Sequence, residues 1–154
     1  MDYCLTQVVD RSVSEVDVAA VDAFVQDPAF GGYTSFVGRV RKANHGKDVV
    51  GISYDIHAPL ALNHFRKVAE QLHAEFGPNV RVAIAHAHGR LAVGEVAVAI
   101  AVGTVHRDEA FRACRAAIER VKHESPIWKQ EHYADGDSEW SEGCSLCEPH
   151  THGE

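Results

Sequence analysis

Apolar residues along the chain recur at two spacings, one typical of helices and the other of strands. Spacings of three and four residues predict three helices, which begin near Ser12, Pro59 and His106 and end before Pro28, Gly77 and Pro126. Ser12 and Glu15 have the spacing of a capping box, which marks a helix start. The third helix has an apolar stripe made of Phe111, Cys114, Ile118 and Val121, which we expect to be buried.

Alternating apolar and polar residues between these helices predict strands. The expected strands are residues 4–9, 31–41, 49–57, 80–88, 95–104 and 127–133. A polar loop over 42–48 joins the second strand to the third, and we expect these two to pair as a hairpin. From Ala134 onward the chain is polar and has no period. We therefore predict one domain over 1–133 and a mobile tail over 134–154.

Hairpins placed between helices favour an α+β fold with a mixed, mostly antiparallel sheet and three main helices. The 154 residues suffice for one domain with a core. The formal net charge of −7 argues against general attraction to nucleic acid. No apolar run approaches the roughly 20 residues that span a bilayer, and no signal peptide is recognisable, so we expect a cytoplasmic protein.

Two clusters of positive side chains precede or begin the third helix. Arg39 and Arg41 share one face of a strand end, where they either keep a solvated sheet edge from pairing or bind an anion. His106 and Arg107 stand where a strand gives way to a helix, whose free N–H groups favour anions. Alternatively, His106 only caps or packs against that helix.

Two lysines flank a rigid corner in VKHESPIWKQEH (121–132). Lys122 falls in the last turn of the third helix, where a cation is favoured in any case, and Lys129 follows Pro126 and Trp128. The plain interpretation is one helix-terminal lysine and one strand lysine, with Trp128 in the core. The functional interpretation is that the corner folds the strand back, so that both ammonium groups enter one pocket.

Possible metal ligands occur twice. His86 and His88 share a strand face, but no third ligand has a diagnostic spacing, so a core or surface role is favoured. The tail has the pattern Cys-x2-Cys-x2-His-x-His, formed by Cys144, Cys147, His150 and His152. These are zinc-ligand types, although the histidines are close together and no apolar residues surround them.

Four motifs occur together and in order: FVGRVR (36–41), HAHGRLAVGE (86–95), VHRDEAF (105–111) and VKHESPIWKQE (121–131). In these motifs the chain resembles the MoaE family, the large (catalytic) subunit of molybdopterin synthase. The resemblance covers about residues 30 to 133. It implies a fold of the α/β-hammerhead type and a homodimer within a heterotetramer. A small ubiquitin-like subunit would dock on each copy, with a Gly-Gly C-terminus carried as a thiocarboxylate.

The resemblance also implies the reaction, in which sulfur passes to cyclic pyranopterin monophosphate and forms the dithiolene of molybdopterin. No metal is expected for this chemistry. Matched motif by motif, Lys122 and Lys129 correspond to the two active-site lysines of the family, and Arg41 to the arginine of its Gly-x-Val-Arg motif. His106 and Arg107 correspond to a His-Arg pair that helps to bind the anionic substrate.

Two positions depart from the family pattern. Ala87 stands where the family often has arginine, and Asp55 where it usually has glutamate.

Two other functions stay open: a non-catalytic dimeric scaffold that binds a ubiquitin-like tail, and a zinc-binding protein that acts through its Cys/His tail. The first would share the fold and the partner, whereas the second would explain only the residues after 143.

Overall fold

A computed structural model describes residues 2–141. In chain order its elements are β1 (Cys4–Asp10), α1 (Val18–Phe24), β2 (Gly32–Arg39), β3 (Ala43–Asn44), β4 (Lys47–Ile56), α2 (Ala58–Phe76), β5 (Arg81–Ala92), β6 (Val96–Thr104), α3 (Arg107–Glu124), β7 (Ile127–Tyr133) and β8 (Ser138–Ser141). Most strand pairs are antiparallel, and β1 runs parallel to β5. The expected α+β class is confirmed.

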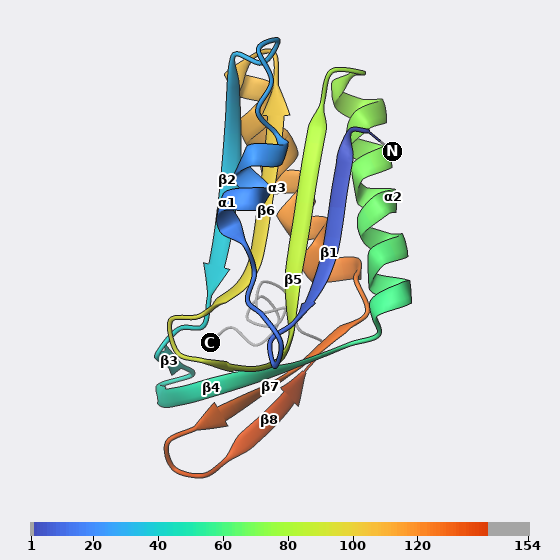
Figure 1. The fold of residues 1–154 in the computed structure, drawn as a ribbon. Helices are drawn as coiled ribbons and strands as arrows, with labels where there is room; N and C mark the ends of the chain where they lie inside the picture. Colours follow the sequence, from blue (N-terminus) through green and yellow to red (C-terminus); the bar gives the residue numbers. More distant parts are fainter. Residues whose placement is uncertain (1, 142–154) are drawn as a thin grey trace.

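The main sheet has the strand order β2-β6-β5-β4-β7-β8. In Figure 1, β2, β6, β5 and β1 stand upright, while β4, β7 and β8 run across the lower end. The long strand β5 connects the two regions, because its first half pairs with β6 and its second half with β4. Helix α3 lies behind the upright strands and α1 in front of them, with α2 beside β1 (Figure 1).

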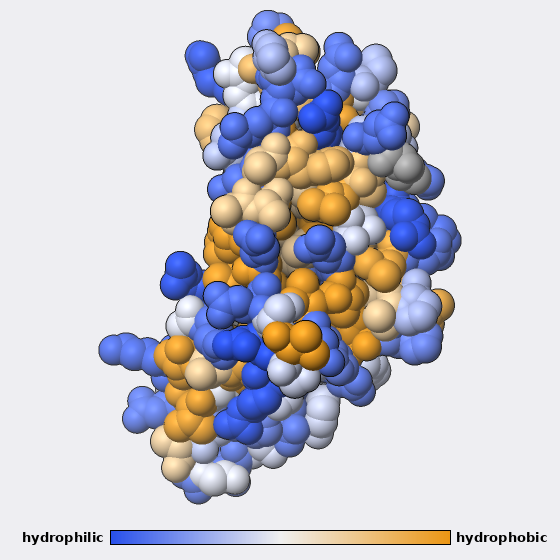
Figure 2. Space-filling model, in the orientation of Figure 1, coloured by the Kyte–Doolittle hydropathy of each residue, from blue (hydrophilic) through white to orange (hydrophobic). Residues whose placement is uncertain are grey.

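The core lies where the helices cover β5 and β6. Eight consecutive residues of β6 and most of β5 are buried, as expected for strands covered on both faces. A proline and a glycine set the bounds of α2. Pro59 lies in its first turn, and the helix ends before Gly77, which has a φ of 103°. Figure 2 shows apolar residues over the middle of the face that carries α1.

No helix in residues 2–141 is long and apolar enough to cross a membrane.

The expected hairpin of β2 with β4 is wrong. β2 pairs with β6, whereas β4 pairs with β5 and β7. Within the described residues, the strand that precedes β4 and pairs with it is β3, which has two residues. Alternation identifies a strand and its inner face, but it carries no information about which distant strand supplies the hydrogen bonds. This difference matters because it places β7, not β2, beside β4.

Three local predictions are also corrected. The first helix begins at Val18, where the carboxylate of Asp17 accepts the N–H of Ala20, while Ser12 belongs to the turn after β1. Beyond Tyr133, the strand β8 pairs with β7, so the sheet continues to Ser141. The side chain of Phe111 is 62% exposed and lies outside the core.

A glycine in β6 permits the close approach of the segment that follows α1. A Cβ added at Gly103 would collide with the carbonyl oxygen of Val25 and would lie 2.7 Å from the ring of Phe30. We predict that Gly103→Ala lowers the free energy of unfolding by about 1–3 kcal/mol, as overpacking does. Gly32→Ala is the matched control, because a Cβ there meets nothing within 4 Å. Urea unfolding of both variants tests this, and equal losses would contradict it.

Candidate active site

The corner after α3 returns the chain to the sheet beside the end of the helix. The N–H of Ser125 donates to the carbonyl of Val121, and β7 then pairs with β4 from Ile127 onward. Alternate residues of β7 are buried, and these include Lys129 and Glu131. The side chain of Trp128 is instead 48% exposed, so its expected place in the core is wrong.

Lys122 and Lys129 approach Tyr54 from two elements. Tyr54 is the register partner of Lys129 in the β4–β7 pair, and the Nζ atom of Lys122 lies 5.3 Å from the centre of its ring. The corner thus brings the two lysines to the same tyrosine. The functional interpretation placed both ammonium groups in one pocket, and of the two only Lys122 lines the cavity described next. A cavity of about 360 Å³ opens at this point, lined by Phe36, Val37, Gly38, Arg39, Arg41, Tyr54, Ala97, Val98, Ile118 and Lys122.

The amine of Lys122 is poised to exchange a proton near neutral pH. Burial lowers the pKa of Lys122 from 10.5 to about 7, and the positive charge of Lys129 acts in the same direction. Burial also raises the pKa of the Tyr54 phenol to about 12, so this ring stays neutral. The cavity therefore holds a lysine whose charged and neutral forms are both populated at physiological pH.

Lys129 is placed in a hydrogen-bonded carboxylate network. Its Nζ atom lies 4.0 Å from Oε2 of Glu131, and both side chains are almost completely buried. The Oε1 atom of Glu131 accepts hydrogen bonds from Asn44 Nδ2 at 2.5 Å and from the Tyr133 hydroxyl at 2.8 Å. Arg41 donates to the Oδ1 atom of Asn44 at 3.3 Å. One bridging asparagine therefore joins the arginine that lines the cavity to the carboxylate beside Lys129.

His106 and Arg107 lie away from this cavity. They stand at the N-terminal end of α3, whereas Lys122 is in its last turn. At 1.5 Å per residue these ends are roughly 20–25 Å apart along the helix axis. Within one chain, the expected grouping of His106 with both lysines and Arg41 is therefore wrong, because a straight helix separates them.

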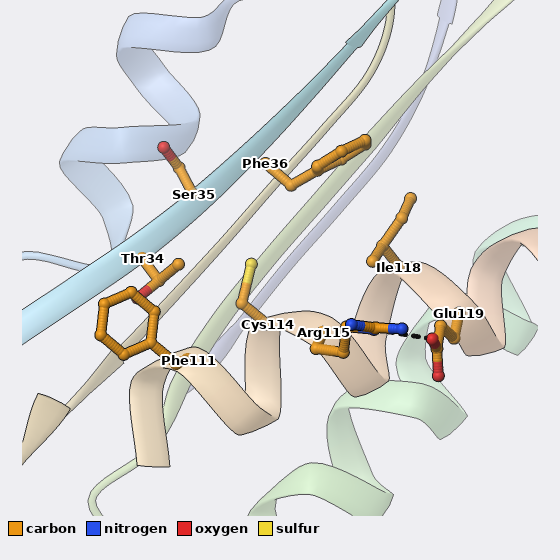
Figure 3. Close-up of a pocket in the computed structure, with 8 residues that line it drawn as sticks. All are labelled: Thr34, Ser35, Phe36, Phe111, Cys114, Arg115, Ile118 and Glu119. Carbon is orange, nitrogen blue, oxygen red and sulfur yellow. Dashed lines mark hydrogen bonds and ion pairs between the residues drawn. The ribbon is translucent and has the colours of Figure 1, made fainter. Parts of the chain in front are cut away.

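An apolar groove borders the cavity between β2 and α3 (Figure 3). Its volume is about 360 Å³, and its lining is Thr34, Ser35, Phe36, Phe111, Cys114, Arg115, Ile118 and Glu119. Phe36 and Ile118 line both spaces. The ring of Phe111 and the edge of β2 are open to solvent in the single chain.

The described residues do not support a metal site at the His86 and His88 pair, and they do not include the Cys/His tail. His86 is fully buried and contacts Lys122, while Nδ1 of His88 accepts the N–H of Ile56 at 3.1 Å. The favoured core role of His86 is thus confirmed. The tail ligands Cys144, Cys147, His150 and His152 lie outside the described residues.

Sequence reasoning missed three residues of the site: His86, Tyr54 and Glu131. A signal existed for Glu131, because strand alternation puts it on the face of Lys129. A signal also existed for His86, a polar residue within the apolar run VRVAIAHAH (80–88). No local pattern indicated that His86 would meet a lysine.

An α+β scaffold whose cavity carries two arginines and a lysine of lowered pKa has the groups needed to bind an anion and to exchange a proton. The chain belongs to the MoaE protein family, whose model matches residues 12–124. The molybdopterin synthase catalytic subunit of Synechococcus elongatus is 40% identical over 145 residues, which are 94% of this chain and 88% of that protein. The corresponding subunit 1 of Mycobacterium tuberculosis is 38% identical, over 90% of this chain and 89% of that protein.

Solved structures agree with this assignment. The crystal structure of molybdopterin synthase from Staphylococcus aureus matches with a TM-score of 0.80 and 30% identity, over 87% of this chain and 94% of that chain. The expected family and fold type are therefore confirmed. As a member of this family, the chain is a sulfur-transferring enzyme of molybdenum cofactor biosynthesis.

The lowered pKa of Lys122 predicts a pH-dependent effect on stability. Below about pH 7 the folded protein must bury a charged amine, and this cost falls as pH rises from about 7 towards 10.5. Lys122→Met should therefore raise the free energy of unfolding near pH 7 and raise it less near about pH 9.5. Urea unfolding at the two pH values measures the difference. Lys67→Met, on the exposed face of α2, is the control, and an equal gain for Lys122→Met at both pH values would refute the assignment.

Proposed function

We propose that this cavity transfers sulfur from the thiocarboxylated C-terminus of a small ubiquitin-like subunit to cyclic pyranopterin monophosphate. The observation that carries the proposal is the gathering of Lys122, Arg39 and Arg41 around one cavity in a chain of net charge −7. Both proposed reactants are anions, and a locally cationic cavity attracts both. A structural relative from Helicobacter pylori was solved as a complex of subunits 1 and 2 of molybdopterin-converting factor, which supports a small partner subunit.

The chemistry has two stages that a fixed cation can assist. The thiocarboxylate sulfur attacks a carbon of the pterin while a carbon–oxygen bond at that carbon breaks, and the oxygen leaves with the electron pair and takes up a proton where it departs as water. The partner tail is then acyl-linked to the pterin through sulfur. Water then cleaves the acyl–sulfur bond, which leaves sulfur on the pterin and a carboxylate on the tail. Negative charge develops on the acyl oxygen during cleavage, and positioned N–H donors stabilise it. Two such rounds form the dithiolene.

Lys122 is assigned to the terminal carbonyl of the partner. With a pKa of about 7, its ammonium form donates to the acyl oxygen and its amine form accepts a proton. Lys129 and Arg41 are assigned to the pterin and its phosphate. The Asn44–Glu131 network supports this pairing, because Arg41 contacts it through a hydrogen bond to Asn44 and Lys129 through an ion pair with Glu131. In this scheme the ammonium and guanidinium groups supply the positive charge, so no resident metal is needed.

His106 and Arg107 are assigned to the cavity of a second copy. Their distance from Lys122 within one chain is the reason, since only another protomer could bring them to the same substrate. The open edge of β2 and the neighbouring apolar groove, with exposed Phe36 and Phe111, offer that protomer a surface next to the cavity. A homodimer of this kind, with one small subunit on each copy, gives the proposed heterotetramer.

Loss of the Lys122 amine tests the catalytic assignment. We expect Lys122→Ala to lower turnover by about 10²–10³-fold or more, because it removes a donor aimed at the developing charge. Binding of the small subunit should survive. The assay mixes the protein with thiocarboxylated small subunit and cyclic pterin and measures molybdopterin, with Lys67→Ala as the control. Near-normal turnover of Lys122→Ala would refute the assignment of this lysine, whereas a wild-type protein that binds the tail but forms no molybdopterin would favour the non-catalytic scaffold.

Mixed dimers test the shared site. Lys122→Ala and Arg107→Ala should each be inactive, yet co-expression should restore about a quarter of wild-type activity. Half of the dimers are then mixed, and each mixed dimer keeps one intact site out of two. Co-expression of Lys122→Ala with Lys129→Ala is the control and should restore nothing, because both lysines come from one chain. Restoration in neither mixture would refute the shared site.

A further inference from the structure

His86 is a fully buried histidine whose two ring nitrogens are both engaged. It lies in the middle of β5, and its Nδ1 atom is 2.8 Å from the carbonyl oxygen of Ala87. A carbonyl oxygen only accepts, so Nδ1 carries the proton and Nε2 presents a lone pair. Burial, together with the positive charge of Lys122, lowers the pKa of His86 well below its usual value. The ring is therefore neutral, and its tautomer is fixed.

The free lone pair of this ring faces the lysine of the cavity. Nε2 of His86 lies 3.2 Å from Nζ of Lys122. The ammonium form of Lys122 has only donors, so in this form the lysine donates and the imidazole accepts. The Tyr54 ring meets His86 edge-on, with centroids 4.9 Å apart and an interplanar angle of 77°, and its face lies 5.3 Å from the same Nζ atom. The amine is thus held between an imidazole nitrogen and an aromatic face, both of them neutral.

A neutral acceptor leaves the positive charge of a lysine uncompensated, whereas a carboxylate offsets it. Lys129 lies beside Glu131, whose negative charge offsets its own. Lys122 instead gains a hydrogen bond while its full charge remains available to a reactant. The acceptor also orients the amine, because one N–H bond points back to the sheet and the other two are left for the cavity.

We propose that His86 is a positioning residue for Lys122: its neutral imidazole accepts one N–H of the lysine and aims the remaining N–H groups into the cavity. This inference rests on the proposed role of Lys122. Nothing in it requires His86 to touch a reactant, and His86 does not line the cavity.

The proposal predicts the direction in which the pKa of Lys122 changes when the acceptor is removed. The charge that acts on its amine is that of Lys129 on β7, and its titratable neighbours are Tyr54 on β4 and His86 on β5. Arg39 of β2 and Arg41, which follows this strand, line the same cavity. Of these groups, His86 supplies a hydrogen-bond acceptor, which favours the ammonium form. Removal of this acceptor should therefore lower the pKa of Lys122 further, by about one unit.

Three variants separate the hydrogen bond from the bulk of the ring. His86→Phe keeps a flat ring and removes the acceptor, whereas His86→Gln can place an amide oxygen near the position of Nε2. His86→Asn keeps a polar group near Nδ1 but is too short to reach Lys122, and it replaces the Phe variant if that variant fails to fold. His88→Phe is the matched control, since it makes the same change on the same strand away from Lys122.

The first readout is independent of turnover. Competitive acylation with acetic anhydride, followed over pH by mass spectrometry, gives the pKa of each lysine in the folded protein. We expect the pKa of Lys122 to fall by about one unit in His86→Phe and His86→Asn, and to stay near the wild-type value in His86→Gln and His88→Phe. An unchanged Lys122 pKa in both acceptor-free variants would overturn the proposal, even if the assigned reaction proved wrong.

The second readout is steady-state kinetics with thiocarboxylated small subunit and cyclic pterin. In the acceptor-free variants we expect kcat to fall about ten- to a hundredfold while KM for the pterin stays constant, with the high-pH limb of kcat moved about one unit lower. His86→Gln should recover most of kcat. A shifted pKa with unchanged kcat would also overturn the positioning role. Failure of the proposed function is a separate result, in which the wild-type protein forms no molybdopterin from these reactants.

Discussion

The antiparallel pairing of β7 with β4 is the interaction on which the site depends. It begins directly after the corner that ends α3, and its register puts Lys129 opposite Tyr54. Because α3 ends against the same tyrosine, Lys122 arrives from the helix and Lys129 from the strand. A slip of one residue in β7 would turn Lys129, Glu131 and Tyr133 to the outer face and would bring out the side that carries Trp128. The geometry of the candidate site is therefore a consequence of sheet register.

The two buried lysine amines have different neighbours, and their chemistry differs accordingly. Lys129 lies beside a buried carboxylate that is itself fixed by Asn44 and Tyr133. Lys122 has a neutral imidazole and an aromatic ring as neighbours, so burial lowers its pKa to about 7. One cation is thus suited to hold a charge in place. The other is suited to exchange a proton with a reactant.

The helix α3 also separates two groups of positive residues that belong to one family pattern. Its rigid length puts His106 and Arg107 at one end and Lys122 at the other. A helix cannot bend enough to join its own ends, so the proposed shared site uses two chains. The apolar groove along α3 and the free edge of β2 are the surfaces that the proposed second copy would cover.

The sequence by itself determined the helices, nearly all strands and the motif that carries the two lysines, because these depend on local period, on proline and glycine positions and on residue type. It also indicated that Lys122 and Lys129 would meet, since only four residues separate the end of α3 from Lys129. The tertiary structure alone decided that β2 pairs with β6, that Trp128 faces solvent and that His86 receives Lys122. His86 and Lys122 are 36 residues apart. Contacts of that kind depend on which strands and helices pack together, and no local pattern records that choice.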